Sequence, residues 1–128
     1  MEKFKPIHQH LLIKAQCRKV IKQPAKAKKM LTDLVNLVGM VPVTKPQAVY
    51  INTPGNEGLT GGINLATSHL CFHIWDDTKM LMLDLYSCCA FDNMEVLEFL
   101  NKLFDFEQVE FIIIDRETMR TSDVITMG

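Results

Sequence analysis

Residues 61–87, with the sequence GGINLATSHLCFHIWDDTKMLMLDLYS, decide the fold of this chain. They divide into three extended segments, 61–66, 70–76 and 79–87, which are rich in β-branched, aromatic and large apolar residues. The pair Asp77-Thr78 between the last two segments is suited to a tight turn. We therefore expect the last two segments to form an antiparallel hairpin.

A two-residue turn at 77–78 also fixes the register of that hairpin, because the residues that flank the turn must pair. Counting back along both strands places Thr67 opposite Cys88. The sequence therefore predicts that a thiol lies beside the peptide bond between Thr67 and Ser68.

Two other segments show the apolar spacing of helices. Pro24 opens the first, which covers 25–38 and ends at Gly39. Asp92 or its neighbour can cap the second, which covers 93–104. Each helix has one apolar stripe, so each is expected to lie on a sheet.

The remaining strands are expected at 8–16, 48–52 and 109–115, while the tail 117–128 gives little signal and is expected to fray. The order β-α-β-β-β-β-α-β has hairpins rather than repeated crossovers. It favours an α+β fold, a two-layer sandwich with an antiparallel sheet and both helices on one face. With 128 residues, 48% of them hydrophobic, the chain is expected to form one domain, 1–128.

Composition bears on the location of the protein. No apolar run approaches the roughly 20 residues that span a bilayer, and the N-terminal segment lacks the apolar run of a signal peptide. We therefore expect a cytoplasmic protein with no membrane partner. In a chain without a secretion signal, four cysteines are expected to be thiols: Cys17, Cys71, Cys88 and Cys89.

Charge is unevenly distributed along the chain. Residues 1–45 hold 10 Lys and Arg against 2 Asp and Glu, whereas residues 46–128 hold 4 against 13. The basic segment can contact phosphates, but only Phe4 lies near it to stack on bases. We therefore do not expect nucleic-acid binding.

The histidines and glycines do not form a known metal or phosphate motif. His69 and His73 are four residues apart, which on a strand separates them by roughly 13 Å, too far to share an ion. His8 and His10 share a strand face and are interpreted as surface residues. The glycines of 58–62 lack the Gly-Lys-Ser/Thr ending of a phosphate loop. The sequence predicts no metal.

Three short motifs follow Thr60: SH at 68–69, HIW at 73–75 and DLYSC at 84–88. Their spacing from Thr60 to Cys88 matches the pattern of a known family without insertion or deletion. This combination resembles the short bacterial and archaeal form of S-adenosylmethionine decarboxylase, a self-processing enzyme with a covalent pyruvoyl group. In that family a Ser-His opens a strand that ends in His-x-Trp, and the next strand ends in Asp-aliphatic-aromatic-Ser/Thr-Cys. The order of strands and helices is compatible over most of the chain.

The resemblance implies a self-cleavage reaction. The hydroxyl of Ser68 would attack the carbonyl of Thr67, convert the peptide bond to an ester and leave by β-elimination, which yields a pyruvoyl group at residue 68. The products would be a β chain of residues 1–67 and an α chain of residues 68–128. In the family's pattern, the positions that match Thr60 and His73 assist this reaction.

The resemblance also implies how the mature enzyme works. A pyruvoyl group forms a Schiff base with the α-amine of an amino-acid-type substrate and accepts the electrons released with carbon dioxide. Cys88 matches the family's proton donor to the carbanion, and Asp77 matches an acidic position that binds ribose hydroxyls. The family further implies a homodimer with sites near the subunit boundary and a role in polyamine biosynthesis.

The sequence departs from the family's pattern at four places. Thr67 stands where Glu usually precedes the cleaved serine, Asp76-Asp77 replaces Pro-Glu, and Cys88-Cys89 replaces Cys-Gly. The loop 52–58 has no aromatic side chain where family members stack adenine.

These departures keep three functions open. The first is a pyruvoyl-dependent decarboxylase of S-adenosylmethionine. The second keeps the pyruvoyl group but takes a simpler basic amino acid, ornithine or arginine, whose cation would pair with Asp76 and Asp77. The third is an unprocessed homologue that binds a ligand or partner without turnover, for which Thr67 is the main argument.

Overall fold

The secondary structure of the described residues consists of two helices and eight strands. In the computed structural model, which describes residues 4–128, the elements follow in this order. They are β1 (Gln9–Cys17), α1 (Pro24–Val38), β2 (Gln47–Ile51), β3 (Gly58–Leu65), β4 (Ser68–Trp75), β5 (Met80–Ser87), α2 (Asn93–Phe104), β6 (Phe106–Asp115), β7 (Arg120–Thr121) and β8 (Ile125–Met127). Residues 1–3 of the expected domain 1–128 and β chain 1–67 lie outside the described residues.

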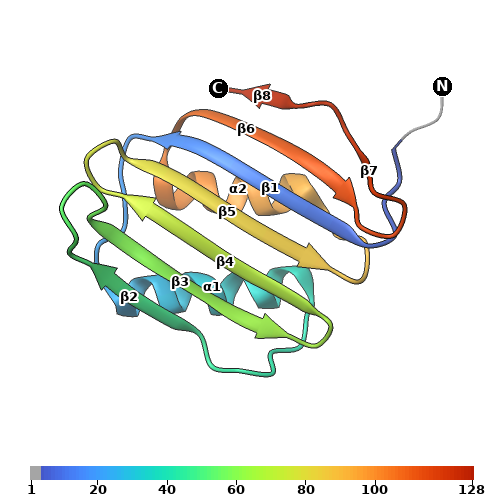
Figure 1. Cartoon of the computed structure of the whole chain (residues 1–128), viewed down its shortest axis with the longest axis horizontal. Helices are drawn as coiled ribbons and strands as arrows, with labels where there is room; N and C mark the ends of the chain where they lie inside the picture. The colour runs from blue at the N-terminus through green and yellow to red at the C-terminus, as the bar shows by residue number, and fades with distance from the viewer. Residues whose placement is uncertain (1–3) are drawn as a thin grey trace.

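The strands form one sheet, and both helices lie on the same face of it (Figure 1). The strand order is β2-β3-β4-β5-β1-β6-β7, with β8 paired to β6, and every pairing is antiparallel. The expected two-layer α+β sandwich is confirmed. The face of the sheet opposite the helices, called the open face below, carries no helix among residues 4–128.

The core lies between the sheet and the two helices. Side chains alternate across each strand, so β4 buries Leu70, Phe72 and Ile74 while the residues between them point to the open face. The helices contribute their apolar stripes to the same layer: Ala27, Met30, Leu31, Leu34 and Val35 from α1, and Val96, Leu97, Leu100 and Phe104 from α2. Burial of these stripes holds both helices on the sheet.

The hairpin of β4 and β5 has the predicted register. His69 pairs with Tyr86, and pairing continues to Trp75 opposite Met80. The connection therefore comprises four residues, 76–79, rather than the two-residue turn expected at 77–78. Because the loop is longer by one residue on each side, the register is unchanged.

The C-terminal tail corrects the expectation of a frayed end. β7 pairs with β6 through Ile114 opposite Thr121, and β8 pairs with β6 through Val109 opposite Met127. Strands of two and three residues are too short to show an alternating pattern, so nothing in the local sequence reveals them. They form because the outer edge of β6 offers unpaired backbone groups.

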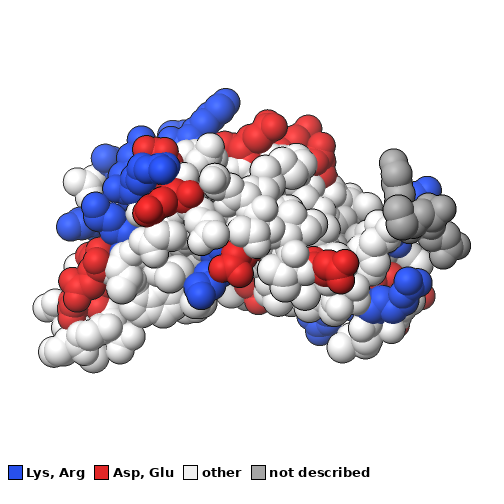
Figure 2. Space-filling view, turned by 90° about the horizontal axis from the view of Figure 1, so that it is seen from above, with Lys and Arg blue, Asp and Glu red and all other residues white. Residues whose placement is uncertain are grey.

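Basic side chains are concentrated at one end of the face seen in Figure 2, where some Asp and Glu lie beside them. Further charged side chains of both signs lie elsewhere on that face. Among the described residues, no helix is both long and apolar enough to cross a bilayer.

Candidate active site

A strained turn joins β3 to β4 at the predicted cleavage position. Leu65 pairs with Ser68, so the turn consists of Ala66 and Thr67. Thr67 has a φ of 57°, in the left-handed region that β-branched residues rarely occupy. Strain is therefore located at the residue whose carbonyl carbon forms the Thr67–Ser68 bond.

The thiol of Cys88 lies beside this turn, as the register predicted. The Thr67 hydroxyl donates a hydrogen bond to Cys88 Sγ over 3.0 Å. The backbone N–H of Cys88 donates to the Ser68 hydroxyl oxygen over 3.1 Å, which fixes the Ser68 side chain. Ser68 is buried and Thr67 is exposed, so the peptide bond between them lies at the boundary between the buried core and the solvent.

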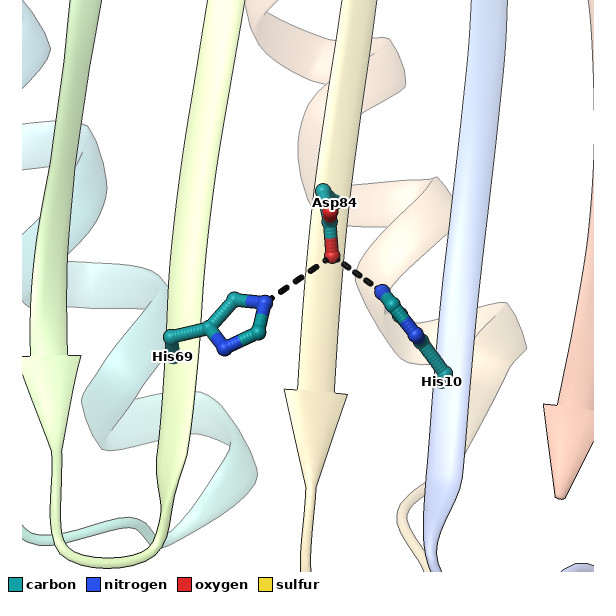
Figure 3. Close-up of side chains that lie close together, drawn as sticks. All are labelled: His10, His69 and Asp84. Carbon is teal, nitrogen blue, oxygen red and sulfur yellow. Dashed lines mark hydrogen bonds and ion pairs between the residues drawn. The ribbon is translucent and has the colours of Figure 1, made fainter. Parts of the chain in front are cut away.

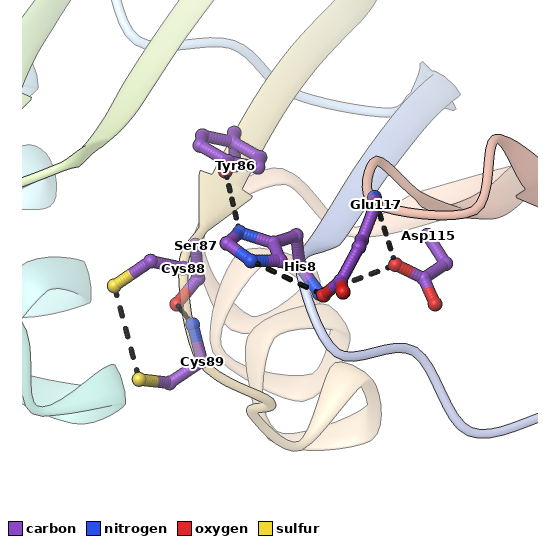
Figure 4. Close-up of polar contacts among 7 residues, drawn as sticks. All are labelled: His8, Tyr86, Ser87, Cys88, Cys89, Asp115 and Glu117. Atoms are coloured by element: carbon purple, nitrogen blue, oxygen red, sulfur yellow. Dashed lines mark hydrogen bonds and ion pairs between the residues drawn. The ribbon is translucent and has the colours of Figure 1, made fainter.

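The environment of Cys88 favours its thiolate. The hydrogen bond from Thr67, followed by those with Ser68 and Cys89, lowers the pKa of the Cys88 thiol below its usual value. Cys89 is adjacent, with its Sγ 3.8 Å from that of Cys88 (Figure 4). Hydrogen bonding to Cys88 and repulsion from its charge raise the pKa of Cys89. All four cysteines are free, as expected.

Gln9 holds the segment that carries Cys88, a role that the sequence did not reveal. Its side chain is 2% exposed. It donates to the carbonyl of Phe91 over 3.1 Å and to the Asn93 side chain over 2.7 Å, and it accepts from the N–H of Phe91 over 3.1 Å. Residues 88–92, the connector between β5 and α2, are therefore tied to β1. Gln9 falls on a core-facing position at the start of an apolar strand, and a glutamine at such a position is the sequence signal that could have identified this role.

Thr60 and His73 form a second group, away from Ser68. They are opposite each other on β3 and β4, and Thr60 Oγ1 lies 3.1 Å from His73 Nδ1. His73 is exposed on the open face, whereas Ser68 points toward the helices. His73 is five positions along the strand from Ser68, which corresponds to about 17 Å. One chain therefore does not bring these two groups together.

The acidic turn 76–79 lies at the same end of β4 as His73. Asp77 is exposed there, and neighbouring Asp76 accepts a hydrogen bond of 2.6 Å from the Tyr50 hydroxyl. That hydrogen bond, together with the charges of nearby carboxylates, raises the pKa of Tyr50. The second carboxylate oxygen of Asp76 is buried and has no hydrogen-bond partner within residues 4–128. The turn is thus suited to a hydrogen-bond donor or a cation.

A cluster of His10, Asp84 and His69 crosses the centre of the open face, and it corrects the interpretation of His10 as a surface residue (Figure 3). His10 is only 8% exposed, and it donates a short hydrogen bond to Asp84. His69 lies 3.3 Å from the same carboxylate oxygen. Burial raises the pKa of Asp84, but the hydrogen bonds and charges of the two histidines outweigh it, and the net pKa is lowered.

These three side chains are the group in the described residues that could hold a metal ion, because their ligand atoms lie within 4.8 Å of one another. The surroundings of His10 oppose that use. Arg116 Nη1 lies 3.2 Å from His10 Nδ1, and a guanidinium can only donate, so this contact requires Nδ1 to accept while Nε2 faces Asp84. A neutral His10 that bound a metal through Nε2 would carry its proton on Nδ1, where it would face the Arg116 donor. We therefore interpret the cluster as a hydrogen-bonded network.

The open face also holds a shallow, mainly apolar cavity of about 470 Å³. Its lining includes Leu12, Cys71, His73, Met82, Ile112 and Val124. Met82 is 41% exposed at its edge. An exposed apolar area of this kind is typical of an interface.

The comparisons with known proteins agree with the motif pattern. The family described as S-adenosylmethionine decarboxylase matches residues 9–117 of the 128 residues. No curated protein sequence matches the chain. The matched region spans β1 to the end of β6 and includes both groups of predicted site residues. The chain therefore belongs to the S-adenosylmethionine decarboxylase family.

Proposed function

We propose that this chain is a pyruvoyl-dependent decarboxylase of S-adenosylmethionine that cuts itself between Thr67 and Ser68 and serves polyamine biosynthesis. Family membership supports the reaction class. The observation that carries the proposal is the local geometry of the bond: the Thr67 backbone is strained, and the Cys88 thiol is 3.0 Å from the Thr67 hydroxyl.

Self-cleavage begins at the Ser68 hydroxyl, which the N–H of Cys88 holds in place. Attack of Ser68 Oγ on the carbonyl carbon of Thr67 forms the C–O bond and breaks the C–N bond, with the proton passing to the released amine. Loss of the Ser68 Cα proton then expels the Thr67 carboxylate and leaves dehydroalanine at position 68. This tautomerises to an imine, which water hydrolyses to the pyruvoyl group with release of ammonia. Release of strain at Thr67 favours the first step, because the left-handed conformation no longer has to be kept.

The residues around position 68 fit a pyruvoyl group. That group supplies an electron acceptor for the carbon–carboxylate bond when it is present. Cys88 lies beside it and delivers a proton to the substrate carbon, which requires the protonated thiol at that moment. The lowered pKa of Cys88 means that this thiol releases its proton readily.

Thr60 and His73 are proposed to act on the cleavage bond of a second copy of the chain. Within one chain they are about 17 Å along the strand from Ser68, and His73 is on the open face. If two open faces pack about a two-fold axis, the Thr60 and His73 end of one chain meets the Ser68 end of the other. The apolar cavity on that face supports a homodimer of this kind.

Co-expression of two inactive variants tests the shared site. Ser68→Ala and His73→Ala chains, each with a different tag, stay uncut when expressed alone. In the mixture, about half of the His73→Ala chains are cut, because random pairing places half of them in mixed dimers. If they remain uncut in mixed dimers that are isolated through both tags, the shared site is wrong.

Intact-mass measurement tests the proposed function itself. The purified protein should consist of two fragments, 1–67 and 68–128, the second beginning with a pyruvoyl group in place of Ser68. Ser68→Ala should remain one chain and release no carbon dioxide. A single full-length species that hydroxylamine does not cleave would contradict the proposal and favour the unprocessed, noncatalytic homologue.

One observation favours a second substrate class. The unpartnered carboxylate oxygen of Asp76 and the neighbouring Asp77 suit a cationic side chain such as that of ornithine or arginine. Carbon dioxide release with S-adenosylmethionine, ornithine and arginine separates the two. We expect release from S-adenosylmethionine, and release from ornithine or arginine alone would assign the second class.

A further inference from the structure

Two adjacent cysteines lie in the connector 88–92, and the proposed reaction uses only one of them. Their Sγ atoms are 3.8 Å apart, and Cys89 is exposed (Figure 4). We propose that Cys88 and Cys89 form a reversible disulfide when the protein meets hydrogen peroxide, which removes the Cys88 thiol and switches the enzyme off. The loss of turnover rests on the proposed function, whereas formation of the disulfide does not.

The two thiols are unequal in a way that suits this reaction. Hydrogen bonds from Thr67, Ser68 and Cys89 lower the pKa of Cys88, so it carries the larger thiolate fraction. The pKa of Cys89 is raised by the same contact, so it remains a thiol. Cys88 is therefore the side chain that peroxide attacks first, and Cys89 is placed to react with the product.

The other two cysteines are protected from the same oxidant. Cys17 is buried, and burial raises its pKa to about 11. Burial, followed by the charge of Asp84, raises the pKa of Cys71. Because the thiolate is the form that reacts with peroxide, both should be oxidised more slowly than Cys88.

The chemistry balances with peroxide as the oxidant. The Cys88 thiolate attacks one peroxide oxygen, the O–O bond breaks, and Cys88 becomes a sulfenic acid while hydroxide leaves. The Cys89 sulfur then attacks Cys88 Sγ, forms the S–S bond and expels the oxygen, which leaves as water with the Cys89 proton. Two thiols lose two electrons, and one peroxide gains them.

The position of the pair makes the disulfide easy to reverse. Neighbouring Cα atoms are about 3.8 Å apart, below the usual Cα separation of bridged cysteines, which is about 4.4 to 6.8 Å. The resulting strain makes the bond easily reduced. The connector lies outside the helices and strands, so its backbone can adjust to the disulfide. That adjustment breaks the hydrogen bond of 3.0 Å that the N–H of Cys89 donates to the Ser87 hydroxyl.

Peptide mapping of the full-length protein tests the disulfide directly. After peroxide treatment, remaining thiols are blocked with N-ethylmaleimide and the protein is digested with trypsin. No Lys or Arg lies between Lys79 and Lys102, so one peptide, 80–102, carries both Cys88 and Cys89 and no other cysteine. In the oxidised protein we expect this peptide to carry no maleimide adduct and to be two hydrogens lighter than the reduced, unlabelled peptide. After treatment with dithiothreitol, both cysteines should again react with N-ethylmaleimide.

Two matched substitutions control the experiment. Cys89→Ser should keep the turnover of the untreated enzyme, form no disulfide, accumulate a Cys88 sulfenic acid that dimedone traps, and lose activity irreversibly on further oxidation. Cys71→Ser should form the disulfide as the wild type does.

The outcomes separate this inference from the proposed function. Full maleimide labelling of peptide 80–102 in peroxide-inactivated protein would overturn the inference, as would a disulfide that joins two chains. If the disulfide forms in protein that neither cuts itself nor releases carbon dioxide, the site stands and the proposed function fails.

Discussion

Thr67 has a backbone conformation that its side chain disfavours. Its φ of 57° places a β-branched residue where a turn usually has glycine or asparagine. The surrounding strands impose this conformation, because Leu65 and Ser68 must pair across the turn. Such strain at a predicted reaction site is consistent with a bond prepared for cleavage.

Glycine at position 67 should relieve the strain. In a Ser68→Ala background, which keeps the chain whole, Thr67→Gly should raise the free energy of unfolding by about 1 kcal/mol, the cost of the left-handed conformation less the extra chain entropy of glycine. With Ser68 present, the same change should slow self-cleavage. Urea denaturation and the time course of scission measure the two effects.

Thr32→Gly is the control, because Thr32 lies within helix α1. It should lower the free energy of unfolding by roughly 0.3 kcal/mol, the difference in helix propensity between threonine and glycine. An equal loss in Thr67→Gly would contradict strain at the turn.

Asp84 should make the fold sensitive to acid. Its pKa is lowered in the folded protein, so its stabilising effect is present above the pKa of the unfolded chain, about 3.9, and is lost as the pH falls through the folded pKa. Asp84→Asn should therefore lower the free energy of unfolding at pH 7. The side chain is 34% exposed, so solvent screening limits this loss to about 1 kcal/mol.

The difference between wild type and Asp84→Asn should shrink in denaturation curves recorded at acidic pH, once the pH falls below about 3.9 and through the lowered pKa of folded Asp84. Asp123→Asn, at an exposed site, is the control and should change little at either pH. A loss in Asp84→Asn that is the same at both pH values would mean that ionisation of Asp84 is not its cause.

Prediction from sequence worked where contacts are local in the hairpin and failed where they cross several strands. The contact between Thr67 and Cys88 follows from a short loop and the pairing it imposes. The cluster of His10, Asp84 and His69 depends on β1 lying next to β5, a neighbour far away in sequence. No local pattern encodes that neighbour.

The connector 88–92 is the irregular segment that determines where Cys88 lies. Gln9 of β1 ties it down with three hydrogen bonds, and Asp92 ends it as the cap of α2, accepting from the N–H of Met94 over 2.9 Å. The bounds of α2 match the prediction because its cap and apolar stripe are both local signals. The strands β7 and β8 were missed because they are too short to carry such a signal.

Loss of the Gln9 side chain should loosen this connector. Gln9→Ala should lower the free energy of unfolding by about 2 to 3 kcal/mol, because buried groups on Phe91 and Asn93 lose their partners. We also expect the carbon dioxide release rate to fall, since Cys88 is less well positioned. Denaturation and steady-state kinetics measure both.

Gln16→Ala is the matched control on the same strand, since its side chain donates only to the exposed turn at Thr78. It should lower the free energy of unfolding by less than about 1 kcal/mol and leave turnover intact. Equal effects of the two changes would show that Gln9 has no special role.

The two faces of the sheet differ in what covers them. One is buried under α1 and α2, while the other exposes apolar side chains around a network of histidines and an aspartate. The proposed dimer would cover the second face and complete each site. The sequence predicted the layers, since each helix has one apolar stripe. The four predicted site residues form two separate groups, because alternation along β4 sends Ser68 and His73 to opposite faces.

A charge on the open face should separate the dimer. Met82→Lys places an ammonium group at the edge of the apolar cavity, so we expect a monomer in sedimentation analysis and an uncut chain. Met94→Lys is the control, because Met94 is equally exposed, 41%, but lies on helix α2. It should remain a dimer and be cut. A cut monomer of Met82→Lys would show that one chain suffices for cleavage.

The strand order decides what scission does to the molecule. β1 belongs to residues 1–67, yet it lies between β5 and β6, which belong to residues 68–128, while β3 stays bonded to β4. The two products of the proposed cleavage would therefore stay joined through paired strands and would not separate while the sheet is intact. Refolding of the cut protein would be bimolecular, because the two fragments must associate before the sheet can form. The yield of refolded sheet should therefore rise with protein concentration. The uncut Ser68→Ala chain should form the same sheet with a yield that does not depend on dilution. If the proposed cleavage occurs, an enzyme that unfolds in dilute solution should therefore seldom recover.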